Sequence, residues 1–189
     1  WIGNVNLLNA YTDIEEDKMN LPKRVKMLQR IDTKKLQFTI ALLYVIPTVL
    51  SAFLPFWFFV VFLLAELDGA FYSLKPLRFK ANPFLSLLSF SGAIFFPMLG
   101  AWTLTYENFN IPMIIFFLTY SFFVYGTVKN IPDYEGDKKV NLKTTATIFD
   151  SRRKAIAFSS ALLVSPYLIL MALILSSYID QKFSLLLLG

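Results

Sequence analysis

The sequence of 189 residues contains neither cysteine nor histidine. The absence of cysteine excludes disulfide frameworks and thiol catalysis. Together the two absences exclude zinc sites built from histidine or cysteine, and the absence of histidine excludes imidazole acid–base catalysis. Carboxylate, lysine, tyrosine and asparagine side chains remain as the groups that can carry chemistry.

The balance of polar and apolar residues that is typical of a soluble domain is also missing. Hydrophobic residues make up 56% of the chain, and the mean hydropathy is +0.56. Residues 36–74 are almost continuously apolar, and a single helix of that length would reach about 58 Å, far beyond a hydrocarbon core of about 30 Å. The segment therefore predicts two membrane spans, with a turn at residues 51–55.

We expect the rest of the chain to continue this pattern, which predicts an all-α, multi-spanning transmembrane helix bundle. Further spans are expected at residues 83–103, 112–128 and 155–177. Residues 1–11 are typical of the end of a helix and residues 183–189 of the start of another, and a first residue of tryptophan is unlike a native start. The expectation is a single membrane-embedded domain over residues 1–189 that is incomplete at both ends.

Basic residues gather on one side of the predicted membrane. The connections at residues 18–35, 75–80 and 129–154 carry 17 of the 18 lysines and arginines, and Lys182 is the exception. The positive-inside rule makes this side cytoplasmic. Most of these charges can simply set the topology and contact anionic lipid headgroups. The same distribution argues against nucleic acid as a partner, although the net charge is +5.

Two acidic clusters lie on this cytoplasmic side at the ends of apolar segments. Each contains one asparagine and two aspartates at a spacing that puts all three on one helix face. They are Asn9, Asp13 and Asp17 in the first cluster, and Asn130, Asp133 and Asp137 in the second. Carboxylates at the edge of a bilayer are costly to desolvate and repel one another, so two such faces favour a cation between them. Hard oxygen ligands at this spacing suit Mg²⁺, which points to a metal-dependent enzyme of a phosphorylated lipid.

A third polar segment faces the same compartment. It contains Tyr72, Lys75, Arg78 and Lys80, which can offer a hydroxyl donor and several cations to a diphosphate. Basic residues at helix ends also occur in any multi-spanning protein, so this segment taken alone decides nothing.

Two acids and many aromatic residues inside the apolar segments leave their roles open. Glu66 and Asp68 precede Tyr72 in an apolar run, where an ionisable group is expensive, and Asp68 lies one turn before Tyr72. The 20 phenylalanines could line an apolar tunnel and stabilise a cation through their ring faces, or only pack against lipid. Pro47 and Pro97 should kink their helices.

The three polar segments together resemble the motifs of the UbiA superfamily of intramembrane prenyltransferases. Residues 9–17 resemble its N-x-x-x-D-x-x-x-D motif, residues 133–137 its D-x-x-x-D motif, and residues 72–80 its Tyr-Ser-x-Pro-Pro-x-Arg/Lys-x-Lys loop. Order and spacing match over most of the chain. Two positions depart from the family, because Ala10 and Asn130 stand where many members have an acid.

The resemblance implies a bundle of nine membrane helices, of which this chain lacks the first and the last ones. It also implies Mg²⁺-dependent transfer of an isoprenyl group from a polyprenyl diphosphate to a lipophilic or aromatic acceptor, with release of pyrophosphate. Asp13, Asp17, Asp133 and Asp137 would be the catalytic metal ligands. Substrate contacts would come from Asn9, Arg24, Tyr72, Lys75, Arg78, Lys80, Asn130 and Lys138.

Two other classes are weaker matches. A membrane Mg²⁺ enzyme of phospholipid synthesis that uses a cytidine nucleotide would need a D-x-x-D-G-x-x-A-R cluster, of which the chain has only Asp68 and Gly69, with Ala65 in place of the first aspartate. A divalent-cation transporter would place its acids near the midplane of the membrane. Here they lie at helix ends among basic residues.

Overall fold

The chain folds into a bundle of α-helices, and the computed structural model describes residues 1–106, 110–139 and 141–178. No strand occurs within these residues, so the predicted all-α class is confirmed. The expected helix start at residues 183–189 lies outside the described residues. The elements are α1 (Ile2–Thr12), α2 (Ile14–Asn20), α3 (Pro22–Leu28), α4 (Thr33–Ser51), α5 (Phe56–Ser73), the 3₁₀ turn η1 (Phe79–Ala81), α6 (Pro83–Thr105), α7 (Met113–Lys129), α8 (Tyr134–Lys139), α9 (Arg152–Leu163) and α10 (Ser165–Leu175).

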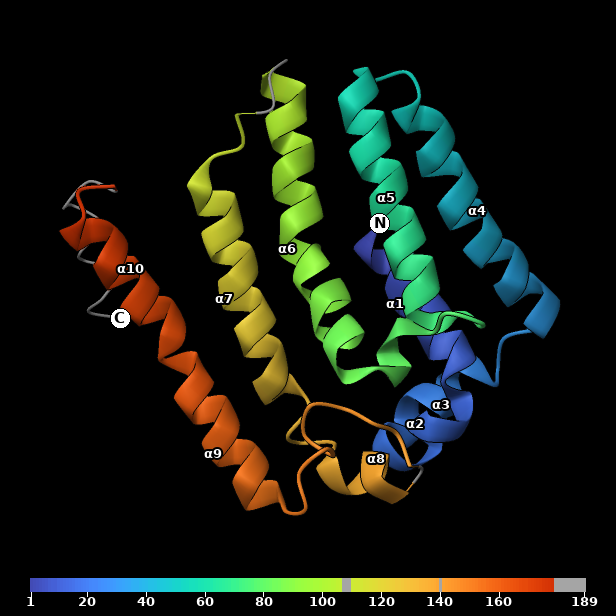
Figure 1. Cartoon of the computed structure of the whole chain (residues 1–189). Helices are drawn as coiled ribbons and strands as arrows, with labels where there is room; N and C mark the ends of the chain where they lie inside the picture. Colours follow the sequence, from blue (N-terminus) through green and yellow to red (C-terminus); the bar gives the residue numbers. More distant parts are fainter. Residues whose placement is uncertain (107–109, 140, 179–189) are drawn as a thin grey trace.

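The long helices stand side by side in the order α4, α5, α6, α7 and α9, and α1 packs against α4 and α5 (Figure 1). The predicted turn within residues 36–74 is observed, because α4 ends at Ser51 and α5 begins at Phe56. Four helices, α4 to α7, separate α3 from α8. An even number of helices returns the chain to the same end of the bundle. The short helices α2, α3 and α8 lie together at that end (Figure 1).

Three helical segments of the described residues are long and apolar enough to cross a membrane. They are α5, α6 and residues 152–175, which comprise α9 and α10. α7 is apolar but shorter, and α4 is not among the three. The span expected at residues 155–177 is interrupted after Leu163, because Pro166 has no N–H for the carbonyl of Leu162. The Ser165 hydroxyl donates to that carbonyl instead, at 2.7 Å.

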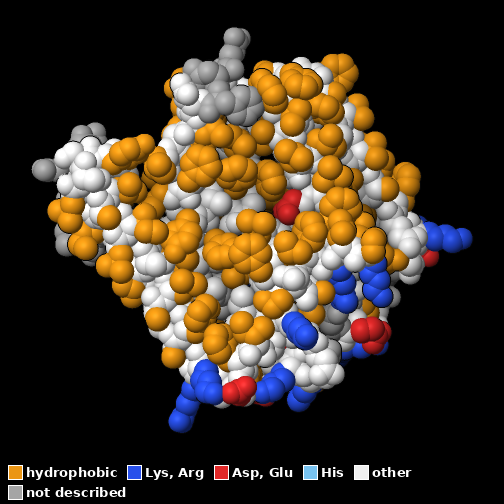
Figure 2. All heavy atoms as spheres, viewed as in Figure 1, with side chains coloured by type: hydrophobic (Ala, Val, Ile, Leu, Met, Phe, Trp, Pro, Cys, Tyr) orange, Lys and Arg blue, Asp and Glu red, His pale blue; other side chains and the backbone are white. Residues whose placement is uncertain are grey.

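The surface separates into an apolar region and a charged end. Hydrophobic side chains cover most of the face in Figure 2, and the basic side chains gather at its lower part, where α2, α3 and α8 lie. Large apolar side chains such as Phe38, Phe53 and Leu175 are exposed. Exposed apolar surface on this scale is typical of helices that face lipid.

Helix α1 is anchored along its length to α5. Gly69 allows this close approach, since a Cβ atom there would lie 2.2 Å from a methyl group of Val5. The Trp1 indole donates to the carbonyl of Ala65 at 2.7 Å, and the Asn4 amide donates to the buried Glu66 carboxylate at 2.7 and 3.0 Å. These contacts account for Glu66 structurally. They hold the first half of α1 against α5, about one turn before Asn9, where the first acidic cluster begins.

Candidate active site

The first acidic cluster lies where α1 meets α2. Asp13 is the C-cap of α1 and precedes α2, so the helix is interrupted within the cluster. The backbone nevertheless keeps helical hydrogen bonds from Asp13 to Asn9 and from Asp17 to Asp13, at 3.0 and 2.8 Å. Asn9, Asp13 and Asp17 therefore stay on one side of the chain. Both aspartates are buried, and Asn9 is half-buried.

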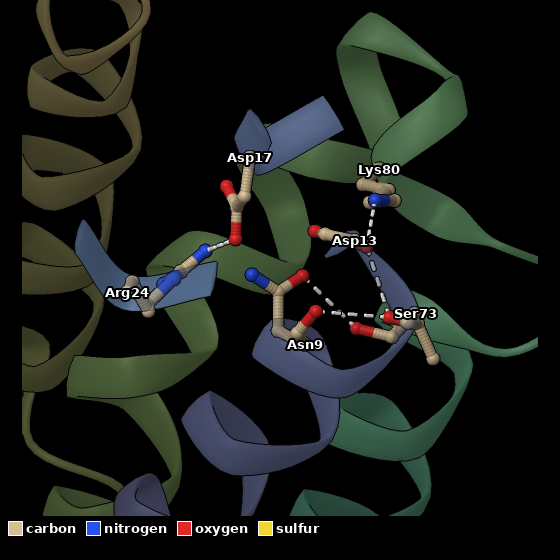
Figure 3. A network of polar contacts seen from close by, with 7 residues as sticks. Asn9, Asp13, Asp17, Arg24, Ser73 and Lys80 are labelled. Atoms are coloured by element: carbon tan, nitrogen blue, oxygen red, sulfur yellow. Dashed lines mark hydrogen bonds and ion pairs between the residues drawn. The ribbon is translucent and has the colours of Figure 1, made fainter. Parts of the chain in front are cut away.

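Each aspartate of this cluster has a basic partner from a neighbouring element. Lys80 of η1 forms an ion pair with Asp13, and Arg24 of α3 forms one with Asp17 (Figure 3). The Ser73 hydroxyl at the end of α5 donates to the Asn9 side chain at 3.1 Å. The first cluster is thus tied to the end of α5 and to the residues that follow it.

The second cluster lies opposite, at the end of α7 and in α8. Asn130 caps α7 and donates to Thr145 at 2.9 Å. Asp137 is buried and Asp133 is exposed. Gly136 brings α8 against α2, because a Cβ atom there would lie only 2.0 Å from the Asn20 side-chain oxygen. A residue without a side chain between the two aspartates thus lets the two clusters approach.

Both clusters line one cavity of about 310 Å³, here called the polar cavity. Nine of the predicted site residues line it: Asn9, Asp13, Asp17, Arg24, Tyr72, Lys80, Asn130, Asp133 and Asp137. Four carboxylates and the cations of Arg24, Lys80 and Lys129 therefore surround the same space. The lining comes from segments more than a hundred residues apart in the sequence.

Three predicted diphosphate contacts do not line the polar cavity. Lys75 is exposed, and Arg78 is half-buried with a left-handed backbone (φ 37°). Lys138 donates to the Tyr134 hydroxyl at 2.9 Å and to the Asp150 carbonyl at 3.0 Å. The hydrogen bond to Tyr134 raises the pKa of Lys138. In this structure Lys138 is thus engaged away from the cavity.

The sequence reasoning did not select four polar residues that line the polar cavity: Asn20, Ser86, Lys129 and Thr144. Lys129 is the most informative, because its ammonium group lies 4.3 Å from the centre of the Phe90 ring and 5.9 Å from that of Tyr72. Its position directly before Asn130 of the second cluster is the feature of the sequence that could have indicated Lys129 as a site residue. Helical geometry turns that residue toward α5 and α6, whereas Lys138 turns toward residue 150.

A second cavity of about 400 Å³ adjoins the first and is here called the aromatic cavity. It shares Asn9, Tyr72 and Lys129 with the polar cavity. Its wall includes Phe90 and Phe122, whose rings stack with centres 4.6 Å apart. The site therefore joins a charged compartment to an apolar one.

The donor set of the polar cavity fits Mg²⁺. No three acidic side chains among the described residues lie close enough to form a metal centre by themselves. Mg²⁺ does not require one, since it commonly binds through one or two carboxylates and completes its shell with water and phosphate oxygens. Asp13 and Asp17 on one side, and Asp133 and Asp137 on the other, are suitable ligands of this kind.

Comparison with known proteins decides the family. The profile of the UbiA prenyltransferase family matches residues 2–189. The chain belongs to the UbiA prenyltransferase family. This confirms the resemblance recognised in the three motifs, and members of this family are membrane-integral proteins.

Solved structures of the UbiA family share the fold. A UbiA homolog from Archaeoglobus fulgidus bound to DMAPP and Mg²⁺ matches with a TM-score of 0.76, covering 93% of this chain and 63% of that chain at 19% identity. Another structure of a UbiA homolog from the same organism has a TM-score of 0.69, covering 89% of this chain and 60% of that chain at 22% identity.

Two curated proteins are similar in sequence. Digeranylgeranylglyceryl phosphate synthase of Sulfurisphaera tokodaii is 30% identical over 147 residues, which are 74% of this chain and 50% of that protein. The chloroplastic 2-acyl-4-prenylphloroglucinol 6-prenyltransferase of Humulus lupulus is 26% identical over 164 residues, which are 78% of this chain and 39% of that protein. The chain thus spans half or less of the length of these relatives.

Proposed function

We propose that this chain carries the active site of a membrane prenyltransferase. It transfers an isoprenyl group from a prenyl diphosphate to a lipophilic or aromatic acceptor, releases pyrophosphate, and uses Mg²⁺. One observation carries the proposal: a cavity lined by both aspartate clusters and three cations opens beside a cavity with stacked phenylalanines. A prenyl diphosphate likewise consists of a charged diphosphate, which suits the polar cavity, and an apolar isoprenoid chain, which suits the aromatic cavity.

The charges of the polar cavity explain why a metal is needed. Its four carboxylates and three cations leave a formal charge of −1. A diphosphate ester adds about three negative charges and would be repelled by this lining on its own. Roughly two divalent cations would bring the filled cavity near neutrality, which is the lowest-energy arrangement in a site with little water.

The residues of the chain then have separate tasks. Arg24, Lys80 and Lys129 bind diphosphate oxygens, the first two by giving up part of their contact with Asp17 and Asp13. Bound Mg²⁺ supplies charge neutralisation of the leaving diphosphate. As the allylic carbon–oxygen bond breaks, the ring of Tyr72 stabilises the carbocation through its face, and the stacked rings of Phe90 and Phe122 keep water away.

The proposal is tested by removing one carboxylate from each cluster. In the complete protein reconstituted in lipid vesicles, Asp13→Asn and Asp133→Asn should each lower Mg²⁺-dependent prenyl transfer by about 100-fold or more, because each removes a metal ligand. Glu15→Gln is the matched control, since Glu15 is exposed, pairs with Lys18 on the surface, and lies two residues from Asp13. Near wild-type turnover in either aspartate variant would refute the shared metal site.

The active-site end is proposed to face the cytoplasm. The support is the concentration of basic residues at that end of the bundle. The chain has no native cysteine, so single cysteines at the exposed positions of Lys23 and Lys139 give a clean assay. An impermeant thiol reagent should label both positions only from the cytoplasmic side. Labelling of the two positions from opposite sides would overturn both the orientation and the site.

A further inference from the structure

Asp68 is a carboxylate that the diphosphate chemistry does not use. It lies on α5 one helical turn deeper in the bundle than Tyr72, and it lines the aromatic cavity. It is half-buried, and the Ser89 hydroxyl of α6 donates to its Oδ2 atom at 2.8 Å. Gly92 leaves space for it, since a Cβ atom there would lie 3.2 Å from Oδ2.

The surroundings of Asp68 leave it able to bind a ligand. Within the described residues, the Ser89 hydroxyl is its only hydrogen-bond donor. An ionised carboxylate can accept about four hydrogen bonds. Glu66, two residues earlier on α5, provides the contrast, because Asn4 contacts both of its oxygens and Glu66 is not part of the lining of the aromatic or the polar cavity. The hydrogen bonds from Asn4 account for the buried carboxylate of Glu66, whereas the carboxylate of Asp68 lines the aromatic cavity.

We infer that Asp68 binds and deprotonates the nucleophilic hydroxyl group of the acceptor, so that the acceptor is an alcohol or a phenol. This rests on the proposed function, because it assigns the second substrate of that same site. The acceptor oxygen forms a bond to the allylic carbon as the bond from that carbon to the diphosphate breaks. The bonding electron pair leaves with pyrophosphate, and the hydroxyl proton passes to Asp68.

The geometry of the two cavities supports this assignment. The aromatic cavity adjoins the polar cavity at Asn9, Tyr72 and Lys129, so a hydroxyl held at Asp68 faces a diphosphate ester from the membrane side. Phe90 and Phe122 offer an apolar wall to the body of the acceptor. A carboxylate nucleophile would instead meet the like charge of Asp68 in a site with little water, which disfavours carboxylic acids as acceptors.

The test compares acceptors that differ only in the reacting group. The complete protein in lipid vesicles is given geranylgeranyl diphosphate, Mg²⁺ and one of four probes: 1-O-hexadecylglycerol, its analogue with a thiol in place of the reacting hydroxyl, 4-nonylphenol or hexadecanoic acid. We expect transfer to the alcohol or the phenol and none to the acid. Asp68→Asn should lower transfer to the hydroxyl probe by about 100-fold. Transfer to the thiol should fall less than about tenfold, because a thiol with a pKa of about 8.5 needs little help from a base.

Controls separate this role from folding and from diphosphate binding. Glu66→Gln neutralises a neighbouring buried carboxylate and should leave the ratio of hydroxyl to thiol transfer unchanged. Ser89→Ala removes the group that orients Asp68 and should shift this ratio in the same direction as Asp68→Asn, but less. Binding of an unreactive geranylgeranyl thiolodiphosphate to Asp68→Asn should stay within about twofold of wild type.

The inference is overturned by any of three results. They are equal losses for the hydroxyl and thiol probes in Asp68→Asn, preferential transfer to hexadecanoic acid, and no transfer to any probe by a protein that binds the thiolodiphosphate. Failure of the wild-type protein to bind the thiolodiphosphate would instead refute the proposed function.

Discussion

The two ion pairs of the first acidic cluster differ in burial, and this predicts unequal costs of breaking them. The side chains of Lys80 and Asp13 are only 6% and 9% exposed. In Lys80→Met the Asp13 carboxylate stays buried without this cation, which costs about 3–5 kcal/mol. The Thr12 hydroxyl still donates to it at 2.9 Å, which favours the lower part of this range. Asp17 is as buried as Asp13, at 9% exposed, but its partner Arg24 is 36% exposed, so water screens this pair and reaches Asp17 when Arg24 is replaced. Arg24→Met should therefore cost only about 1 kcal/mol.

Thermal unfolding in detergent, followed by the fluorescence of the three tryptophans, measures this difference. For a chain of this size about 1 kcal/mol corresponds to roughly 2–4 °C. We therefore expect Lys80→Met to lower the Tm by about 10 °C and Arg24→Met by about 3 °C. Adding Asp13→Asn to Lys80→Met should recover most of the loss, since the buried charge of Asp13 is then removed together with that of Lys80. Equal Tm shifts for the two single variants, or no recovery in the double variant, would refute the electrostatic reasoning.

Two further predictions concern residues around the polar cavity. Lys129→Gln should weaken binding of a prenyl thiolodiphosphate by about tenfold, whereas Lys138→Gln should change it less than twofold, because only Lys129 lines the cavity; equal effects in an equilibrium binding assay would contradict this placement. Gly136→Ala should lower the apparent Mg²⁺ affinity in transfer assays several-fold, because the added Cβ atom displaces Asn20 and separates α8 from α2. Unchanged Mg²⁺ dependence in Gly136→Ala would show that this close approach does not position the second cluster.

Most of the fold could be predicted because membrane helices follow from simple limits on length and polarity. The turn between α4 and α5 was placed correctly, since the largely apolar residues 36–74 are too many to cross one bilayer as a single helix. The interruption after Leu163 was missed although Pro166 was visible in the sequence. An isolated proline in an apolar run is compatible with a kink or a break, and the choice depends on whether a neighbour such as Ser165 satisfies the freed carbonyl.

The site was predictable where helical spacing fixed it and not where tertiary packing did. Asn9, Asp13 and Asp17 share a side because successive turns of one chain segment place them there. No such rule tells which of two lysines beside the second cluster turns inward. The neighbours of each lysine decide it. The Lys129 ammonium lies against the rings of Phe90 and Tyr72, whereas the Lys138 ammonium donates to the Tyr134 hydroxyl. Both are favourable contacts for a cation, so only the packing of α6 against α7 makes Lys129 the one that lines the polar cavity.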